Sequence, residues 1–306
     1  MYLGKGPLGP VTQQEVADDE SHQARVDAQH RNGADSPRTR GVHGRTADVW
    51  LNTSRRWTAP LPINVYVIEH ERGLVLFDTG QDRRSVTEGD YFPSGAAGHI
   101  FRRLAKFEIR PDETLGRGLA SLGYEIADVH TAILSHLHQD HIGGLPELSH
   151  ARIVVSASEF ADLDRPFAAM RGLLHRHIDL PGLRWQLVTP APTQDDSIAP
   201  FEAAHDLFDD GSLLLVPTPG HTPGSLSLLL RTPGLPLMLF VGDLTYDVKR
   251  LATERVPGVG VHGELVQSTR AINELVRRHP GALVLAAHDP AASRLLATAE
   301  EASASS

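Results

Sequence analysis

The chain of 306 residues contains no cysteine. Disulfides, thiolate metal sites, iron–sulfur clusters and a cysteine nucleophile are therefore excluded. No apolar run approaches the roughly 20 residues that a membrane-spanning helix needs. The first residues also lack a charged stretch followed by an apolar one, so the sequence indicates no signal peptide. We therefore expect a cytoplasmic protein.

Positive charge is scarce as well. Lysine and arginine number 29 against 38 aspartates and glutamates, which gives a net charge of -9. An acidic chain without a long basic run is a poor binder of nucleic acid or anionic membranes, so we expect a small-molecule substrate and neither of those partners. The apolar fraction of 41% is ordinary for a globular chain and allows a sizeable core.

The first 48 residues contain no isoleucine and no phenylalanine, which begin at Ile63 and Phe77. Such a segment buries too little apolar surface to offset the entropy lost on ordering. We therefore predict a flexible N-terminal extension over residues 1–48, a single domain over 49–299 and a disordered tail over 300–306.

Hydrophobic patterning within the domain predicts two runs of strands, each followed by helices. Strands are expected at 63–68, 74–77, 131–134, 152–155, 185–188, 213–216, 225–230, 237–241 and 283–287. Helices are expected at 100–107, 112–122, 156–164, 264–278 and after Pro290. This order indicates an α/β layered sandwich of sheets with helices outside.

The histidine content is unusually high, at seventeen residues. Three of them, His136, His138 and His141, fall with Asp140 within six positions, directly after a predicted buried strand. Side chains two residues apart share a face, and those beyond a bend can face a second position nearby. The spacing suits two adjacent metal ions; the alternative is a solvated histidine-rich loop.

Three further side chains stand at the ends of later predicted strands. They are His221, Asp243 and His288. Loops at the carboxyl ends of strands converge on one rim in layered α/β proteins, where ligands bind. We therefore expect these residues to join the central motif.

The H-x-H-x-D-H pattern, the separate His, Asp and His, and the early Asp78-Thr79-Gly80 together resemble the metallo-β-lactamase superfamily over residues 60–290. The resemblance implies an αβ/βα four-layer sandwich with two central mixed sheets. It also implies a two-metal centre, with Asp78 anchoring a loop through hydrogen bonds. The implied ligands are His136, His138 and His221 for one ion, Asp140, His141 and His288 for the other, and Asp243 as the bridge.

Imidazole and carboxylate ligands suit Zn²⁺, and also Co²⁺, Mn²⁺ or Fe²⁺. Paired ions lower the pKa of a bridging water, and the resulting hydroxide attacks an electrophilic centre. Oxygen-reducing members of the superfamily carry Glu at the position of His138, so histidine there favours hydrolysis.

Within the superfamily the sequence resembles the N-acyl homoserine lactonases. The similar stretches are residues 61–66, Gly220-His221-Thr222-Pro223-Gly224, and Tyr246, three residues after Asp243. The resemblance implies a quorum-quenching hydrolase that opens the lactone ring. Tyr246 would donate a hydrogen bond to the lactone oxygen, and Asp140 would protonate the leaving alkoxide. The plainer interpretation of Tyr246 is a partly buried aromatic side chain, and that of Asp140 is a metal ligand without a further role.

Alternatives stay open because Gln139 and the N-terminal extension depart from the lactonase pattern. The runner-up is another lactone, aryl-ester or phosphotriester hydrolase using the same two-metal site. A non-catalytic binding protein is a third hypothesis, and a homodimer is suggested by analogy alone. Residues that could line an acyl-chain pocket, or merely pack in the core, are Trp57, Phe92, Phe167, Met170 and Leu173.

Overall fold

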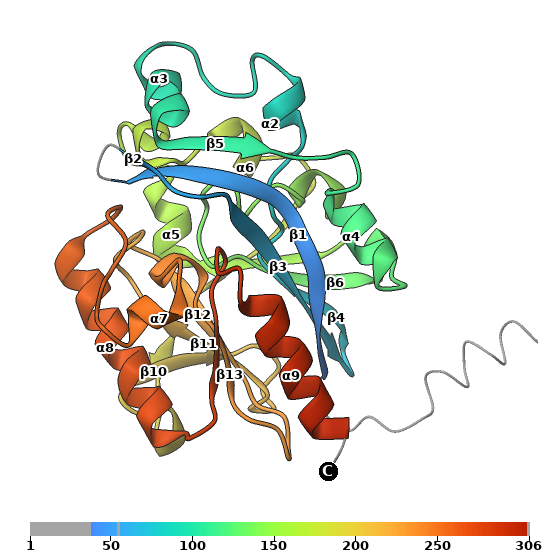
Figure 1. Cartoon of the computed structure of the whole chain (residues 1–306), viewed down its shortest axis with the longest axis vertical. Coiled ribbons are helices and arrows are strands. Elements are labelled where there is room, and N and C mark those ends of the chain that lie inside the picture. The colour runs from blue at the N-terminus through green and yellow to red at the C-terminus, as the bar shows by residue number, and fades with distance from the viewer. Residues whose placement is uncertain (1–37, 54–55, 305–306) are drawn as a thin grey trace, which may run out of the picture. The chain divides into compact units, whose positions relative to one another are not determined.

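Two β-sheets stacked face to face form the centre of the structure (Figure 1). The computed structural model describes residues 38–53 and 56–304. The strands of the first sheet are β1 (Arg38–Thr53), β2 (Arg56–Trp57), β3 (Leu61–His70), β4 (Gly73–Phe77), β5 (Ala105–Glu108), β6 (Val129–Ile133), β7 (Arg152–Ser156) and β8 (Arg184–Val188). The strands of the second are β9 (Ala191–Pro192), β10 (Ala203–Asp206), β11 (Leu213–Pro217), β12 (Leu226–Leu230), β13 (Met238–Phe240) and β14 (Leu283–Leu285).

Both sheets are mixed. The first runs β2-β1-β3-β4-β6-β7-β8, with β5 also paired to β1. Its β3–β4 hairpin is antiparallel, whereas β4, β6, β7 and β8 are parallel neighbours. The second runs β14-β13-β12-β11-β10-β9, and only the β13–β14 pair is parallel.

Side chains of β11 show why the layers form. Leu213 and Leu215 face the first sheet and pack with Phe77 and Ile133 between the two sheets. Leu214 faces the opposite way, toward the helix that covers the second sheet. A strand buried on both faces needs a continuous apolar run, and β11 has one.

Helices cover the outer faces of the sheets. The α-helices are α2 (Arg84–Thr87), α3 (Gly95–Leu104), α4 (Leu115–Ser121), α5 (Ala157–Asp162), α6 (His175–Ile178), α7 (Val248–Leu251), α8 (His262–Arg278) and α9 (Ala292–Ala304). Helix α4 packs on the first sheet and α8 on the second, while α9 adds Leu296 to the core between the sheets (Figure 1). The four-layer αβ/βα sandwich is thus confirmed. Within the described residues, no helix combines the length and apolarity needed to cross a membrane.

The main differences from the predicted boundaries lie at the two ends of the domain and at residues 100–107. Strand β1 begins at Arg38, ten residues before the expected end of the extension, because its main chain pairs with β3 whatever its side chains are. The expected helix 100–107 ends at Leu104, and the chain then extends as β5 to pair with β1. Helix α9 continues to Ala304, into the expected tail. The rest of the predicted extension, 1–37, lies outside the described residues.

Gly143 offers a test of how closely the loops pack. An added Cβ would lie 2.1 Å from the main-chain nitrogen of Asp82 and 2.2 Å from the carbonyl carbon of Gln81. Both are backbone atoms, which cannot move away without straining the loop. We expect Gly143→Ala to lower the free energy of unfolding by about 3 kcal/mol, measured by denaturant titration. Gly263→Ala, whose Cβ meets nothing within 4 Å, is the control and should not destabilise. Equal stability of the two variants would contradict the expectation.

Candidate metal centre

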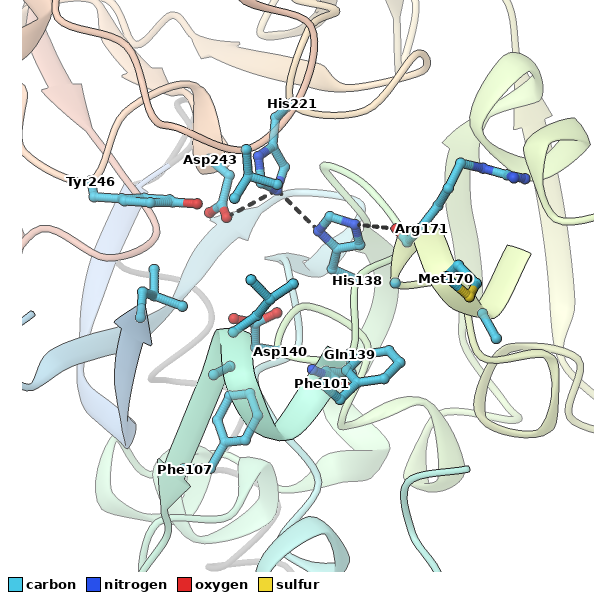
Figure 2. A pocket seen from close by; sticks show the side chains of 16 residues that line it. Phe101, Phe107, His138, Gln139, Asp140, Met170, Arg171, His221, Asp243 and Tyr246 are labelled. Carbon is cyan, nitrogen blue, oxygen red and sulfur yellow. Dashed lines mark hydrogen bonds and ion pairs between the residues drawn. The ribbon is translucent and has the colours of Figure 1, made fainter. Parts of the chain in front are cut away.

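Seven histidine and aspartate side chains meet at the carboxyl ends of four strands. The motif residues His136 to His141 follow β6. His221 follows β11, Asp243 follows β13 and His288 follows β14. The structure therefore brings together every metal-ligating residue that the sequence proposed, and Figure 2 shows four of them converging on one space.

Three histidine nitrogens form the first group. Nδ1 of His138 lies 3.1 Å from Nε2 of His136 and 3.0 Å from Nε2 of His221. Burial and neighbouring imidazoles lower the pKa of His136 well below its usual value, and burial lowers that of His221 to about 3. Both rings are therefore neutral at pH 7.

Asp140, His141 and His288 form the second group, and Asp243 lies between the two. Oδ1 of Asp243 is 3.3 Å from Nε2 of both His141 and His288, whereas its Oδ2 is 3.3 Å from Nε2 of His221. Oδ2 of Asp140 lies 3.5 Å from Nε2 of His288. One carboxylate thus faces both groups, which is the geometry expected of a bridge.

Outer hydrogen bonds set which nitrogen faces inward in His288, His141 and His136. Nδ1 of His288 donates to the carbonyl of Pro62 at 2.9 Å, and Nδ1 of His141 donates to Oδ2 of Asp78 at 2.9 Å. A ring whose outer nitrogen carries the proton presents a lone pair from the other. His136 is held in the same way by the Ser135 hydroxyl at 2.9 Å.

These residues fit a pair of divalent cations. In the first group, the outer nitrogens of His136 and His138 bond to oxygens, so Nε2 of His136 and Nδ1 of His138 present lone pairs to each other at 3.1 Å, and a cation between them would remove that repulsion. In the second group, burial alone would lower the pKa of His141, but Asp243, Asp78 and Asp140 outweigh it and raise that pKa well above its usual value. Both groups therefore favour positive charge.

Several buried atoms of the centre have no hydrogen-bond partner within the described part of the chain. They are Nε2 of His141, Nδ1 of His221, Oδ1 of Asp243 and Nε2 of His288. Buried polar atoms are rarely left unpaired, and three of these four face the space between the ligands. Imidazole and carboxylate donors without thiolate suit zinc or a similar divalent ion.

Asp78 anchors the central motif. It adopts a φ of 61°, in the left-handed region, where Asp is tolerated better than most residues. Its buried carboxylate accepts hydrogen bonds from the main-chain nitrogen of Ser135 at 2.7 Å and the Ser135 hydroxyl at 2.9 Å, besides that from His141. This matches the anchoring role expected from the sequence.

A second buried carboxylate, Glu159 of α5, was missed by sequence reasoning. It accepts the main-chain N–H of Leu137 at 3.0 Å and that of Gly224 at 3.1 Å. Leu137 belongs to the central motif, and Gly224 to the turn that carries His221. One side chain therefore ties together the two loops that supply the first group. A lone glutamate at the start of a helix gave no sign of this.

A cavity opens beside the candidate metal centre, and Tyr246 lines it together with His138, Asp140, His221 and Asp243 (Figure 2). The Tyr246 ring lies 5.3 Å from that of His288. Burial and the carboxylates of Asp243 and Asp140 raise the pKa of Tyr246 well above its usual value. Its hydroxyl therefore keeps its proton at neutral pH and can donate a hydrogen bond.

The rest of the cavity wall is mainly apolar. It is formed by Leu51, Phe101, Leu104, Ala105, Phe107, Ala169, Met170 and Val259, with the main-chain turn at Arg171 and Gly172. Gln139 also lines it, and its buried Oε1 has no hydrogen-bond partner among the described residues. The wall comes largely from β1, α3 and β5, of which β1 and β5 were not predicted.

Only one of the five residues proposed for the acyl-chain pocket lines this cavity, namely Met170. Leu173 is buried in the core of the first sheet. Phe92 packs against Phe101 and Phe107. Trp57 and Phe167 are exposed. The position of the cavity wall depends on the pairing of β5 with β1, and nothing in the sequence indicated that pairing.

Comparisons with known proteins agree with this geometry. A family model described as the metallo-β-lactamase superfamily matches residues 58–288. The N-acyl homoserine lactonase AttM of Rhizobium radiobacter is 30% identical over 232 residues, covering 75% of this chain and 82% of that protein. An N-acyl homoserine lactonase of Bacillus cereus is 28% identical over 231 residues, covering 75% and 82%.

A solved structure shows the likeness of fold. It is a B. thuringiensis AiiA variant with N-decanoyl-L-homoserine bound at its active site, which matches with a TM-score of 0.65 at 22% identity. The match covers 83% of this chain and 93% of that one.

Asp243 provides a test of the candidate metal centre. We expect the reconstituted protein to hold two divalent ions. Asp243→Asn should weaken binding by at least the roughly 10–100-fold that loss of an outer partner costs, because it removes the charge that faces both groups. Metal content after dialysis and chelator competition measure this. Asp247→Asn, at a partly exposed helix cap where asparagine serves equally well, is the control. Unchanged binding of two ions by Asp243→Asn would refute the assignment.

Proposed function

The chain belongs to the metallo-β-lactamase superfamily, and from that premise we propose that it is a dinuclear metal-dependent hydrolase that opens the lactone ring of N-acyl homoserine lactones. Relatives named N-acyl homoserine lactonase support the substrate. The proposed ligands are those two groups of histidine and aspartate with Asp243 between them.

The observation that carries this proposal is the joining of three features in one cavity. The candidate ligands, a protonated Tyr246 and an apolar wall all line the same space (Figure 2). An N-acyl homoserine lactone has the matching parts: a hydrolysable ring ester, oxygens that accept hydrogen bonds, and an alkyl chain. Burial of that chain against Phe101, Phe107 and Met170 would contribute about 0.8 kcal/mol per methylene.

Hydrolysis adds water to the ring carbonyl and breaks the bond between that carbon and the ring oxygen. Two bound divalent ions would supply a deprotonated water at neutral pH and polarise the ester carbonyl. Tyr246 would donate its proton in a hydrogen bond to a substrate oxygen as negative charge develops there. Asp140 lies at the cavity and is placed to carry a proton to the departing alkoxide.

Proton release tests the substrate directly, because lactone opening produces a carboxylic acid. We expect metal-reconstituted protein to acidify a weakly buffered solution of N-acyl homoserine lactone, and a chelator to abolish the release. A series of acyl-chain lengths would define the preference of the apolar wall. Absence of release from a protein shown to hold two ions would refute the lactone assignment and direct the search to aryl esters and phosphotriesters.

Replacement of Tyr246 tests its role. We expect Tyr246→Phe to lower kcat for lactone opening by about 10²-fold, in the range for loss of one donor to a developing oxyanion, with metal content unchanged. Tyr91→Phe is the matched control, since Tyr91 is buried away from the cavity, beside Gln81 and His177. Lactone kinetics unaffected by Tyr246→Phe would mean that the ring only packs.

A further inference from the structure

One short turn contacts both the cavity and the candidate metal centre. It is the 3₁₀ turn Ala168–Arg171, flanked by Phe167 at a φ of 63° and Gly172 at a φ of 95°. Its main chain lies against the cavity, and the carbonyl oxygen of Arg171 accepts a hydrogen bond from Nε2 of His138 at 2.9 Å (Figure 2). A left-handed phenylalanine is uncommon and persists only where surrounding contacts hold the backbone.

The guanidinium of Arg171 supplies such contacts. Its Nε donates to Oδ2 of Asp162 at 2.9 Å, and Nη2 donates to the Asp162 carbonyl at 2.9 Å. Nη1 donates to the carbonyl of Pro166 at 2.6 Å. Asp162 is buried at the end of α5. The planar fork of arginine thus ties the turn to a helix that packs on the first sheet, a set of bonds that a lysine ammonium cannot reproduce.

The position of this turn decides which nitrogen of His138 faces the ligands. A carbonyl oxygen only accepts, so Nε2 of His138 carries the proton and Nδ1 presents its lone pair toward His136 and His221. The turn also touches the ring closely, because a Cβ added at Gly172 would lie 2.4 Å from Cδ2 of His138. Any shift of the turn therefore shifts the imidazole.

His138 differs in this respect from His141 and His288. His141 is held by the side chain of Asp78, and His288 by the carbonyl of Pro62 beside a core strand. The partner of His138 lies on a turn with little regular structure of its own, between two left-handed residues.

We propose that the Asp162–Arg171 pair is a positioning device for His138, which fixes its tautomer and aims Nδ1 at the metal held with His136 and His221. The proposal rests on the metal centre of the proposed function, but not on which ester is cleaved. Arg171 acts through its own carbonyl and not by touching the metal.

Two arginines pair with Asp162, so that one of them can serve as the control for the other. Arg165 also pairs with the Asp162 carboxylate, at 3.0 Å, yet its side chain is 67% exposed, and its contact with Arg171 is through its main-chain carbonyl at 3.4 Å, which Arg165→Met keeps. We expect Arg171→Met to weaken binding of one zinc ion by about 10–100-fold, the usual cost of losing an outer partner. Chelator competition measures this without substrate. Arg165→Met should bind both ions as the unmodified protein does.

The cobalt-substituted protein gives a second measurement that does not depend on activity. Displacement of His138 alters the coordination geometry, so the visible absorption of Co²⁺ should change in Arg171→Met and not in Arg165→Met. Arg171→Lys should fall between them, because its ammonium keeps the charge and loses the fork. Asp162→Asn keeps a carbonyl oxygen for Arg171 and should show a smaller loss than Arg171→Met.

The outcomes separate clearly. Unmodified zinc affinity and cobalt spectrum in a folded Arg171→Met protein would overturn the proposal, as would equal losses in both arginine-to-methionine variants. If Arg171→Met does not fold, Arg171→Lys decides by the same two measurements. A parent protein that binds zinc but opens no lactone would refute the substrate and leave this proposal standing, whereas one that binds no zinc would overturn both.

Discussion

The structure depends on a cluster of buried imidazole and carboxylate groups. Imidazole nitrogens from two loops approach within 3.0–3.1 Å, and oxygens of the Asp243 carboxylate lie 3.3 Å from Nε2 of His141, His221 and His288. Folding must bring these groups together without water to solvate them. Such an arrangement costs several kcal/mol unless a cation compensates. Hydrogen bonds to outer groups behind the candidate ligands hold several of these side chains in place.

Those outer groups come from the frame of the sandwich. Strand ends place the four loops, and main-chain or carboxylate acceptors then orient three of the five rings: Asp78 for His141, Pro62 for His288 and the Arg171 carbonyl for His138. Glu159 performs a related task for the backbone, because it binds one N–H from each of two ligand loops. Each such N–H left unpaired in the interior would cost about 1–3 kcal/mol. The centre is thus preorganised by hydrogen bonds that never touch the metal position.

Sequence alone located the candidate ligands because each stands in a loop after an apolar strand, and because their pattern resembles that of a known superfamily. It also located most strands of both sheets, where the runs are continuous. It missed β1, because a segment with glycines, arginines and a histidine shows no alternation, and its pairing with β3 is a main-chain property. It extended the helix at 100–107 by three residues, because nothing local indicates that Ala105 will find a partner in β1. Contacts between distant segments, such as Glu159 with Gly224, leave no local pattern at all.

The proposed reaction and the choice of substrate differ in the same way. The reaction depends on residues with a local sequence pattern, whereas the choice of substrate depends on a wall formed by contacts between distant segments. The candidate ligands stand in loops after strands whose positions are set by the core, and the sequence alone was enough to propose them. The cavity wall is built from α3, β5, the end of β1 and the 3₁₀ turn, elements that pack at the margin of the first sheet. A side chain such as Leu104 or Phe107 can be exchanged there without disturbing any ligand hydrogen bond, so the wall can vary in shape while the centre stays fixed. The turn that holds Arg171 is the exception, since it contributes to the wall and orients His138 at once. Changes at that turn must satisfy both demands, which makes it the most constrained part of the wall.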